Sequence, residues 1–248
     1  LSYFQVGYYL LAYVFGFLAA LFFLFRAIKK KEINITKEQA YDLIIAALFG
    51  VVIGARIFHI IFWELDYYLT NLVKIFYIWQ GGCSLHGGIV GGVVSLYVYC
   101  KRKKIDIAKL AGILALPSAL GLAVGRITCF INQDIVGTVT SVPWCFKSVY
   151  YVGCRHPVTL YASFGYFILF FSLLAIKRVN LKLKPGFLFW IFLTLAGTGR
   201  FFTDFLREGG IYLGLRVGQW FSLILIIVGG IVLIKYYRKD IGKFFKLV

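Results

Sequence analysis

Long apolar segments separated by short charged stretches constrain what this chain of 248 residues can fold into. Hydrophobic residues make up 61% of the sequence, well above the share in a soluble domain. Each segment is close to the ~20 residues that a helix needs to cross about 30 Å of hydrocarbon. The seven predicted spans are residues 6–26, 40–63, 83–100, 107–131, 157–176, 186–206 and 216–234. We therefore predict an all-α, polytopic membrane protein in which residues 1–248 form a single integral membrane domain.

The distribution of basic residues orients these spans. The formal net charge is +17, and 19 of the 27 lysines and arginines fall in four clusters, at residues 26–37, 101–109, 177–184 and 235–246. The clusters follow the first, third, fifth and seventh spans, so all four lie on one side of the membrane. Because basic loops mark the cytoplasmic side, we predict the N-terminus outside and the C-terminus in the cytoplasm. Clusters of this kind contact lipid headgroups, and no nucleic-acid partner is predicted.

Arginine is favoured among the basic residues outside these clusters. They are Arg56, Lys74, Arg126, Lys147, Arg155, Arg200, Arg207 and Arg216. Orientation needs only charge, whereas recognition of phosphate or carboxylate benefits from the guanidinium fork. Arg56, Arg126 and Arg200 stand near the ends of apolar segments, where an embedded charge costs roughly 2.5–3.5 kcal/mol on insertion scales. The pattern predicts a membrane-embedded pocket for an anion.

Two of these arginines have polar neighbours that allow two interpretations. Arg126 is followed by Asn132 and Asp134, and it either snorkels at the boundary in a pair with Asp134 or binds a ligand. The spacing of Arg200, Asp204 and Arg207 at i, i+4 and i+7 places them on one helix face. That face is either a self-satisfied ladder of ion pairs or part of a phosphate site. Together the two segments could bind a phosphate and stabilise its charge as it leaves.

Histidines and cysteines supply the other candidate chemistry. His86 lies between Gly81-Gly82 and Gly87-Gly88, where it is either a structural residue or an acid–base group that titrates near neutrality. His59 is a weaker candidate, and we expect His156 to position the start of the fifth span. Cys145 and Cys154 share a predicted outer loop, so a disulfide between them is left open. We expect Cys83, Cys100 and Cys129 to be small buried residues, and no metal or other cofactor is predicted.

Two further segments have simpler predicted roles. Residues 64–80 carry apolar residues at helical spacing and flanking tryptophans and tyrosines, which is typical of a segment lying in the membrane interface. We expect Gly91-Gly92 to allow close helix packing.

Several of these residues form a series that resembles a known family. The pieces are Trp79 through His86 to Gly88, Gly125-Arg126 through Asn132 to Gly137, Pro143-Trp144, Arg155-His156-Pro157 with Leu160-Tyr161, Arg200-Phe201 through Asp204-Phe205 to Arg207, and Gly218-Gln219. In this order and spacing the chain resembles the prolipoprotein diacylglyceryl transferases of bacteria. The resemblance covers nearly the whole chain.

The resemblance implies an enzyme of the bacterial cytoplasmic membrane. Members of the family transfer a diacylglyceryl group from phosphatidylglycerol to the lipobox cysteine in the signal peptide of a prolipoprotein. By resemblance, Arg126 and Arg200 bind the lipid headgroup, and Asn132 and Gly137 belong to its pocket. His86 is a candidate base for the substrate thiol, and Tyr9 stands where the family has a functional tyrosine.

The chain also departs from the family pattern. Thr128 and Cys129 stand where the pattern has Gly-Asn, and Asp134 and Ala162 each replace a glutamate. Two alternatives to the enzyme are therefore kept. One is a catalytically silent paralogue that binds anionic lipid or a lipobox peptide. The other is a small membrane transporter, which is disfavoured because the sequence has no internal repeat.

Overall fold

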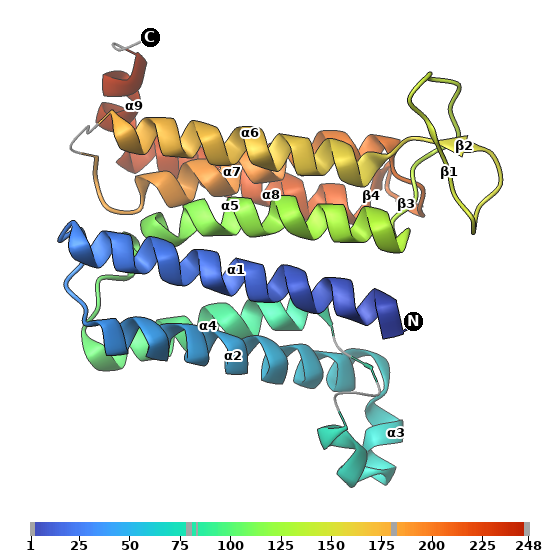
Figure 1. The fold of residues 1–248 in the computed structure, drawn as a ribbon, viewed down its shortest axis with the longest axis horizontal. Coiled ribbons are helices and arrows are strands. Elements are labelled where there is room, and N and C mark those ends of the chain that lie inside the picture. Colours follow the sequence, from blue (N-terminus) through green and yellow to red (C-terminus); the bar gives the residue numbers. More distant parts are fainter. Residues whose placement is uncertain (1–2, 78–80, 83, 180–182, 246–248) are drawn as a thin grey trace. The chain divides into compact units, whose positions relative to one another are not determined.

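The chain folds mainly into helices (Figure 1). The computed structural model describes residues 3–77, 81–82, 84–179 and 183–245. In chain order the elements are α1 (Tyr3–Lys29), α2 (Lys37–Trp63), α3 (Leu65–Thr70), the 3-10 helix η1 (Leu72–Phe76), α4 (Leu85–Lys103), α5 (Ile107–Asn132), β1 (Phe146–Lys147), β2 (Cys154–Arg155), α6 (Val158–Arg178), α7 (Phe187–Thr203), the 3-10 helix η3 (Asp204–Leu206), β3 (Ile211–Tyr212), β4 (Leu215–Arg216), α8 (Val217–Tyr236) and α9 (Arg238–Phe245).

These elements divide into two compact units, and each is described by itself. Unit 1 contains residues 1–23 and 108–248, and unit 2 contains residues 24–107. The first helix belongs to both, because its last residues are part of unit 2. Of the predicted site residues, Arg56, His59 and His86 lie in unit 2 and the others lie in unit 1.

Glycines on facing sides of α2 and α4 allow these helices to pack closely in unit 2. A Cβ atom added to Gly91 would lie 2.1 Å from the carbonyl oxygen of Gly50, and one added to Gly54 would lie 2.4 Å from that of Gly87. Small residues spaced four apart let helix backbones approach each other in lipid. The packing role predicted for Gly91 is therefore confirmed.

We expect Gly91→Ala to lower the stability of the protein by about 1–3 kcal/mol, the usual effect of overpacking. The added methyl group would meet backbone atoms of α2, which cannot move without separating the helices. Thermal unfolding in detergent would measure the change. Gly230→Ala in α8 is a matched control, because a Cβ there has no neighbour within 4 Å. A Gly91→Ala protein as stable as this control would contradict the prediction.

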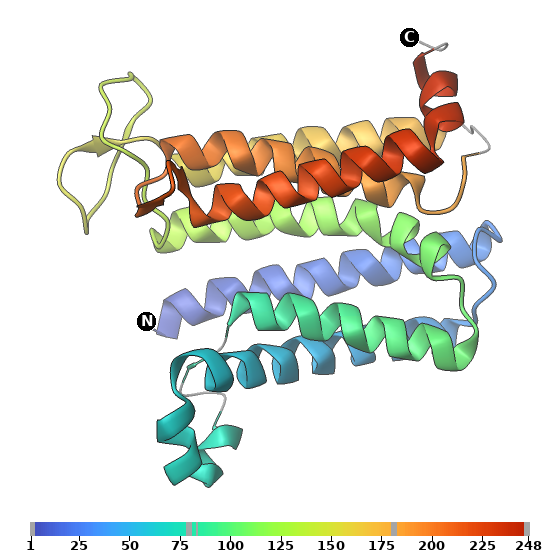
Figure 2. The ribbon, with the colours of Figure 1, turned by 180° about the vertical axis from the view of Figure 1, so that it is seen from behind.

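Helices α5 to α8 form the body of unit 1. They lie side by side in both views, with strands β1 to β4 at one end and α9 at the other (Figures 1 and 2). The hydroxyl of Ser163 in α6 donates to the carbonyl of Ala123 in α5 at 2.8 Å, and Gln219 Nε2 in α8 donates to the carbonyl of Phe201 in α7 at 3.2 Å. Both donors are buried, so these bonds join the helices where no water competes. We call the end that carries the strands the hairpin end.

Five described helices are long and apolar enough to cross a membrane. They are Gly7–Lys29, Lys37–Trp63, Ile107–Asn132, Val158–Arg178 and Val217–Tyr236. Many of their large apolar side chains are exposed, as expected for surfaces that lipid covers. The chain is thus a multi-pass, helical membrane protein. The two other predicted spans are also helical, over α4 and α7, but α7 has only 17 residues and neither helix is among the five. Seven spans remain a prediction.

The predicted interfacial segment at residues 64–80 is not one helix. The structure has the short helix α3 followed by η1, with a break at Asn71. The side chain of Asn71 donates to the carbonyl of Tyr67 at 3.0 Å. Asparagine favours such local bonds over continuing a helix, which explains the break. Trp79 lies outside the described residues.

Candidate functional site

A cavity of about 80 Å³ lies between helices α5, α6 and α7 of unit 1. Most of its lining is apolar, and its polar side chains come from Arg126, Thr159, Tyr161, Tyr166, Arg200, Thr203, Asp204 and Arg207. Three arginines and one carboxylate are thus among the described lining residues. Confined between membrane helices, this excess of positive charge favours an anionic ligand.

Arg200 and Asp204 form a close pair at one side of the cavity. Nε of Arg200 lies 3.8 Å from Oδ2 of Asp204, and Asp204 is only 6% exposed. Neither atom has a hydrogen-bond partner among the described residues, so the pair retains hydrogen-bonding capacity. Gly218 allows the first turn of α8 to approach, because a Cβ there would lie 2.3 Å from Oδ2 of Asp204. The pair therefore depends on a glycine of the neighbouring helix.

Arg207 lines the same cavity without an ion pair to any described residue. It follows η3, where its N–H donates to the carbonyl of Asp204 at 3.3 Å. Asp204 pairs with Arg200 alone, so the predicted ladder of mutually satisfied charges is incomplete. This leaves positive charge available to a ligand.

Arg126 lies in the last two turns of α5, four residues before Phe130. It is one of the residues that line this cavity. The alternative that Asp134 pairs with Arg126 is wrong, because no such ion pair occurs between these described residues. Instead the Tyr9 hydroxyl from α1 donates to Oδ2 of Asp134 and lies 3.4 Å from the Cys129 sulfur. Tyr9 and Asp134 thus meet beside Cys129 of α5.

The remaining predicted site residues are placed elsewhere. Asn132 is buried at the last position of α5 and is not among the lining residues of the cavity. Gly137 also lies outside that lining, although its backbone forms a β-bridge with Arg207. His86 is in the first turn of α4 in unit 2, and its side chain lies outside the described part of the chain. The structure therefore gathers Arg126, Arg200, Asp204 and Arg207 into one cavity.

Three short segments form a hydrogen-bonded ladder at the hairpin end. Residues 136–140 are central, with residues 206–208 on one side and 154–156 on the other. The N–H of Thr138 donates to the carbonyl of Leu206 at 2.8 Å, and the N–H of His156 donates to the carbonyl of Thr138 at 3.1 Å. We call this arrangement the loop ladder. Because Arg207 is part of it, the ladder fixes the backbone that carries one cavity arginine.

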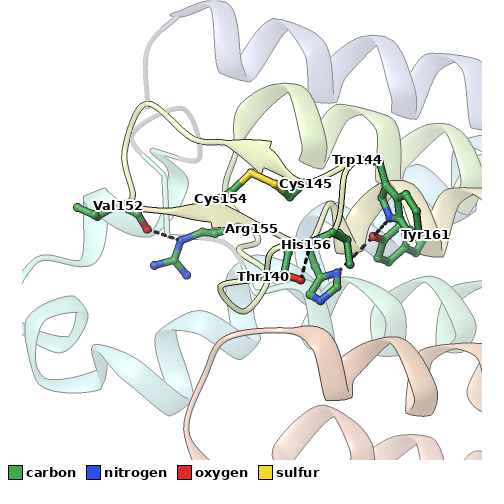
Figure 3. The surroundings of a disulfide bond; sticks show 9 residues. Thr140, Trp144, Cys145, Val152, Cys154, Arg155, His156 and Tyr161 are labelled. Carbon is green, nitrogen blue, oxygen red and sulfur yellow. Dashed lines mark hydrogen bonds between the residues drawn. A yellow bond between two sulfur atoms is a disulfide. The ribbon is translucent and has the colours of Figure 1, made fainter.

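Arg155 and a disulfide reinforce the loop ladder. Nη1 of Arg155 donates to the Gly137 carbonyl at 3.0 Å and to Oε2 of Glu208 at 2.5 Å, so it reaches across all three segments. Cys154, the residue before it, is bonded to Cys145 (Figure 3). The disulfide that the sequence left open is thus present. Cys100 is buried and Cys129 partly buried, whereas Cys83 lies outside the described residues.

Tyr161 is a cavity residue that sequence reasoning missed. Its hydroxyl accepts a hydrogen bond from Nε1 of Trp144 at 2.7 Å and lies 3.3 Å from Nδ1 of His156 (Figure 3). Tyr161 is in the first turn of α6, so His156 contacts the start of the fifth predicted span. All three residues occur in the motif series, but that series gave no indication that they meet.

Arg56 does not belong to the cavity, so the prediction of three pocket arginines is wrong. It lies in α2 of unit 2, is 5% exposed, and donates to backbone carbonyls between residues 74 and 82. The shortest bonds, at 2.6 Å, reach the carbonyls of Lys74 and Gly81. Its guanidinium also lies 4.9 Å from the ring centre of Tyr68. Arg56 satisfies an irregular backbone instead of binding an external anion.

We expect Arg56→Gln to lower the stability of unit 2 by about 1.5–3 kcal/mol for each charged hydrogen bond that is not replaced. Carbonyls between residues 74 and 82 would lose their donor. Limited proteolysis after residue 70 in detergent would report the loosened segment. Arg102→Gln, at the exposed end of α4, is the control. Equal protease resistance of both variants would contradict the structural role of Arg56.

A model of the prolipoprotein diacylglyceryl transferase family matches residues 1–235. The chain belongs to this family. A phosphatidylglycerol–prolipoprotein diacylglyceryl transferase of Geobacter sulfurreducens is 34% identical over 253 residues, covering 98% of this chain and 95% of the relative. Proteins of the same name from Finegoldia magna and Ehrlichia canis are 38% and 31% identical, covering 84% and 91% of this chain and 83% and 89% of the relatives. Family membership thus extends over both units, and the cavity arginines lie within the matched residues.

Proposed function

We propose that this protein transfers a diacylglyceryl group from phosphatidylglycerol to the lipobox cysteine of a prolipoprotein. The proposal follows family membership and the names of the relatives. The structural observation that carries it is the cavity in which Arg126, Arg200 and Arg207 outnumber the single carboxylate of Asp204. A lipid phosphate is an anion that reaches such a cavity from within the membrane.

The reaction requires a thiolate and a stabilised leaving group. The cysteine sulfur attacks the glyceryl carbon that bears the phosphate, a C–S bond forms, and the C–O bond to phosphate breaks. The thiol proton passes to a base, and glycerol phosphate leaves with the bonding electrons. Fixed guanidinium groups stabilise the charge that develops on the departing phosphate. In this proposal Arg126 and Arg200 bind that phosphate, and Arg207 adds positive charge at the same cavity.

The other proposed residues have supporting roles. His86 is the proposed base for the thiol proton, since a histidine titrates near neutrality. Tyr9 and Asp134 orient the headgroup from the α1 side, which is supported by their contact. Asn132 and Gly137 belong to the proposed headgroup pocket, and Asp204 orients Arg200.

The proposal includes an orientation in the bacterial cytoplasmic membrane. With seven spans and the N-terminus outside, the hairpin end of unit 1 faces outward and the cytoplasm contacts the basic residues after α6 and α8. This assignment is supported by the four basic clusters. The thiol of a translocating prolipoprotein would then meet the cavity from the outer side.

Transfer can be tested with the purified chain in vesicles that contain phosphatidylglycerol labelled in its acyl chains. Mixing with a lipobox peptide is expected to place the label on the peptide cysteine, and a peptide with serine at that position is the control. In cells depleted of their own transferase, expression of the chain is expected to restore growth. A well-expressed chain that binds labelled lipid but neither labels the peptide nor restores growth would favour the silent paralogue. Lipid movement between leaflets without peptide labelling would favour a transporter.

A further inference from the structure

Two hairpins at the hairpin end of unit 1 expose large apolar side chains at their tips. In the β1–β2 hairpin, Val149 is 80% exposed and Val152 is 91% exposed. In the β3–β4 hairpin, Leu213 is 76% exposed, and its neighbours Ile211 and Tyr212 are also exposed. Loops and turns are typically marked by Gly, Pro, Asn, Asp, Ser and Thr. Exposed apolar side chains grouped at a tip indicate a contact surface, and each of these hairpins carries such a group.

These tips are held in place by specific contacts. The Cys145–Cys154 disulfide closes the first hairpin, and Oε1 of Gln133 accepts hydrogen bonds from Ser148 Oγ at 2.7 Å and from the N–H of Val149 at 3.2 Å. In the second hairpin, Nε1 of Trp220 donates to the carbonyl of Tyr212 at 3.0 Å. The apolar side chains are thus presented outward by a fixed backbone.

The β3–β4 tip also lies near the membrane boundary. Leu213 is four residues before Val217, the first residue of α8, so at most about 14 Å of extended chain separates them. The headgroup layer on each side of a bilayer is roughly 5–8 Å thick, from the difference between its full and hydrocarbon thickness. A hairpin of this length that leaves a membrane helix stays within or close to that layer unless it points straight outward.

The chemistry of the tips matches a lipid surface better than a water-exposed peptide site. Residues 148–153 and 209–215 contain no charged side chain, and both stretches contain tyrosine. Tyrosine and tryptophan favour the membrane interface, and the exposed Lys147 beside the first tip is attracted to anionic headgroups. We propose that the β1–β2 and β3–β4 tips insert into the interface of the leaflet at the hairpin end.

The proposed contact would anchor the loop ladder from two sides. The β1–β2 hairpin continues into residues 154–156 of the ladder, and the β3–β4 hairpin follows directly after residues 206–208. Insertion of both tips holds the backbone of Arg207 at the level of the lipid headgroups. This membrane contact does not depend on the proposed transfer reaction.

Photo-crosslinking from single positions in the full chain tests the contact. A benzophenone amino acid is placed at Val152 or Leu213, and the protein is reconstituted in vesicles of phosphatidylglycerol and phosphatidylcholine. Phe164, exposed on α6, is the lipid-facing reference, and Ser141, exposed at the base of the β1–β2 loop, is the control. After illumination, mass spectrometry is expected to find severalfold more lipid adduct at both tips than at Ser141.

Two outcomes would overturn the membrane contact. One is an adduct yield at Val152 and Leu213 no higher than at Ser141, while Phe164 reacts with lipid. The other is that a lipobox peptide added to the vesicles displaces the lipid adducts at both tips and is itself crosslinked. The second result would make the tips a peptide-docking surface. Intact disulfide and unchanged thermal unfolding of each labelled protein exclude misfolding as the cause.

Discussion

Replacing Arg126 or Arg200 with alanine is expected to lower the rate of diacylglyceryl transfer by about 10²–10³-fold, the usual effect of removing one group that stabilises developing charge. Both guanidinium groups line the cavity, and Asp204 is paired with only one of them. Each alanine variant would leave the departing phosphate with less fixed positive charge. Transfer of labelled lipid to the lipobox peptide, measured in vesicles, gives the rate.

Lysine variants separate the role of charge from that of shape. Arg126→Lys and Arg200→Lys are expected to retain more activity than the alanine variants but less than the unmodified chain, because lysine keeps the charge and loses the planar fork. Arg178→Ala is the matched control, since this exposed arginine ends α6 at the opposite end of unit 1. Full activity of both alanine variants would contradict the assignment of Arg126 and Arg200 to phosphate binding.

Gly137→Ala is expected to lower the transfer rate by about 10²-fold, the effect of misplacing a reacting group by about 1 Å. Gly137 does not line the arginine cavity, so the effect would act through the backbone. A Cβ atom at this position would lie 2.1 Å from the carbonyl oxygen of His156. Residues 136–140 and 154–156 would have to separate, and the β-bridge between Gly137 and Arg207 would shift with them.

Gly210→Ala serves as the control for this variant, because a Cβ there has no neighbour within 4 Å. Thermal unfolding and the state of the Cys145–Cys154 disulfide should be measured beside activity, so that a local shift is distinguished from misfolding. If Gly137→Ala transfers lipid as fast as Gly210→Ala, the close approach within the loop ladder is not needed for activity.

Helices were the most predictable part of the fold. A run of some 20 apolar residues has few alternatives to a membrane helix, and helices occur at all the predicted spans. The break at Asn71 was missed because the apolar residues around it keep helical spacing on both sides. The loop ladder could not be foreseen. Its partners, such as Thr138 and Leu206, are far apart in sequence and lie in segments too short to show a periodic pattern.

The sequence predicted that arginines would form the candidate site. It did not predict which arginines would line the cavity. Arg56 and Arg126 occur in similar apolar surroundings, so the sequence favoured the same role for both. Their partners distinguish them, since Arg56 donates to carbonyls between residues 74 and 82 whereas Arg126 lines a cavity with two other arginines. Whether an arginine meets a backbone or a cavity depends on segments that lie many residues away. Tyr161 was missed for the same reason.

The discontinuity of unit 1 constrains the order in which this protein assembles. Tyr9 enters the membrane with the first helix, yet its partner Asp134 is separated from it by 125 positions in the chain. Residues 24–107, which form unit 2, are synthesised between them. The first helix must therefore remain in the bilayer without its native partner until α5 has been inserted. Contacts between such distant residues form late, so a chain interrupted before Asn132 would contain a complete unit 2 and no assembled site.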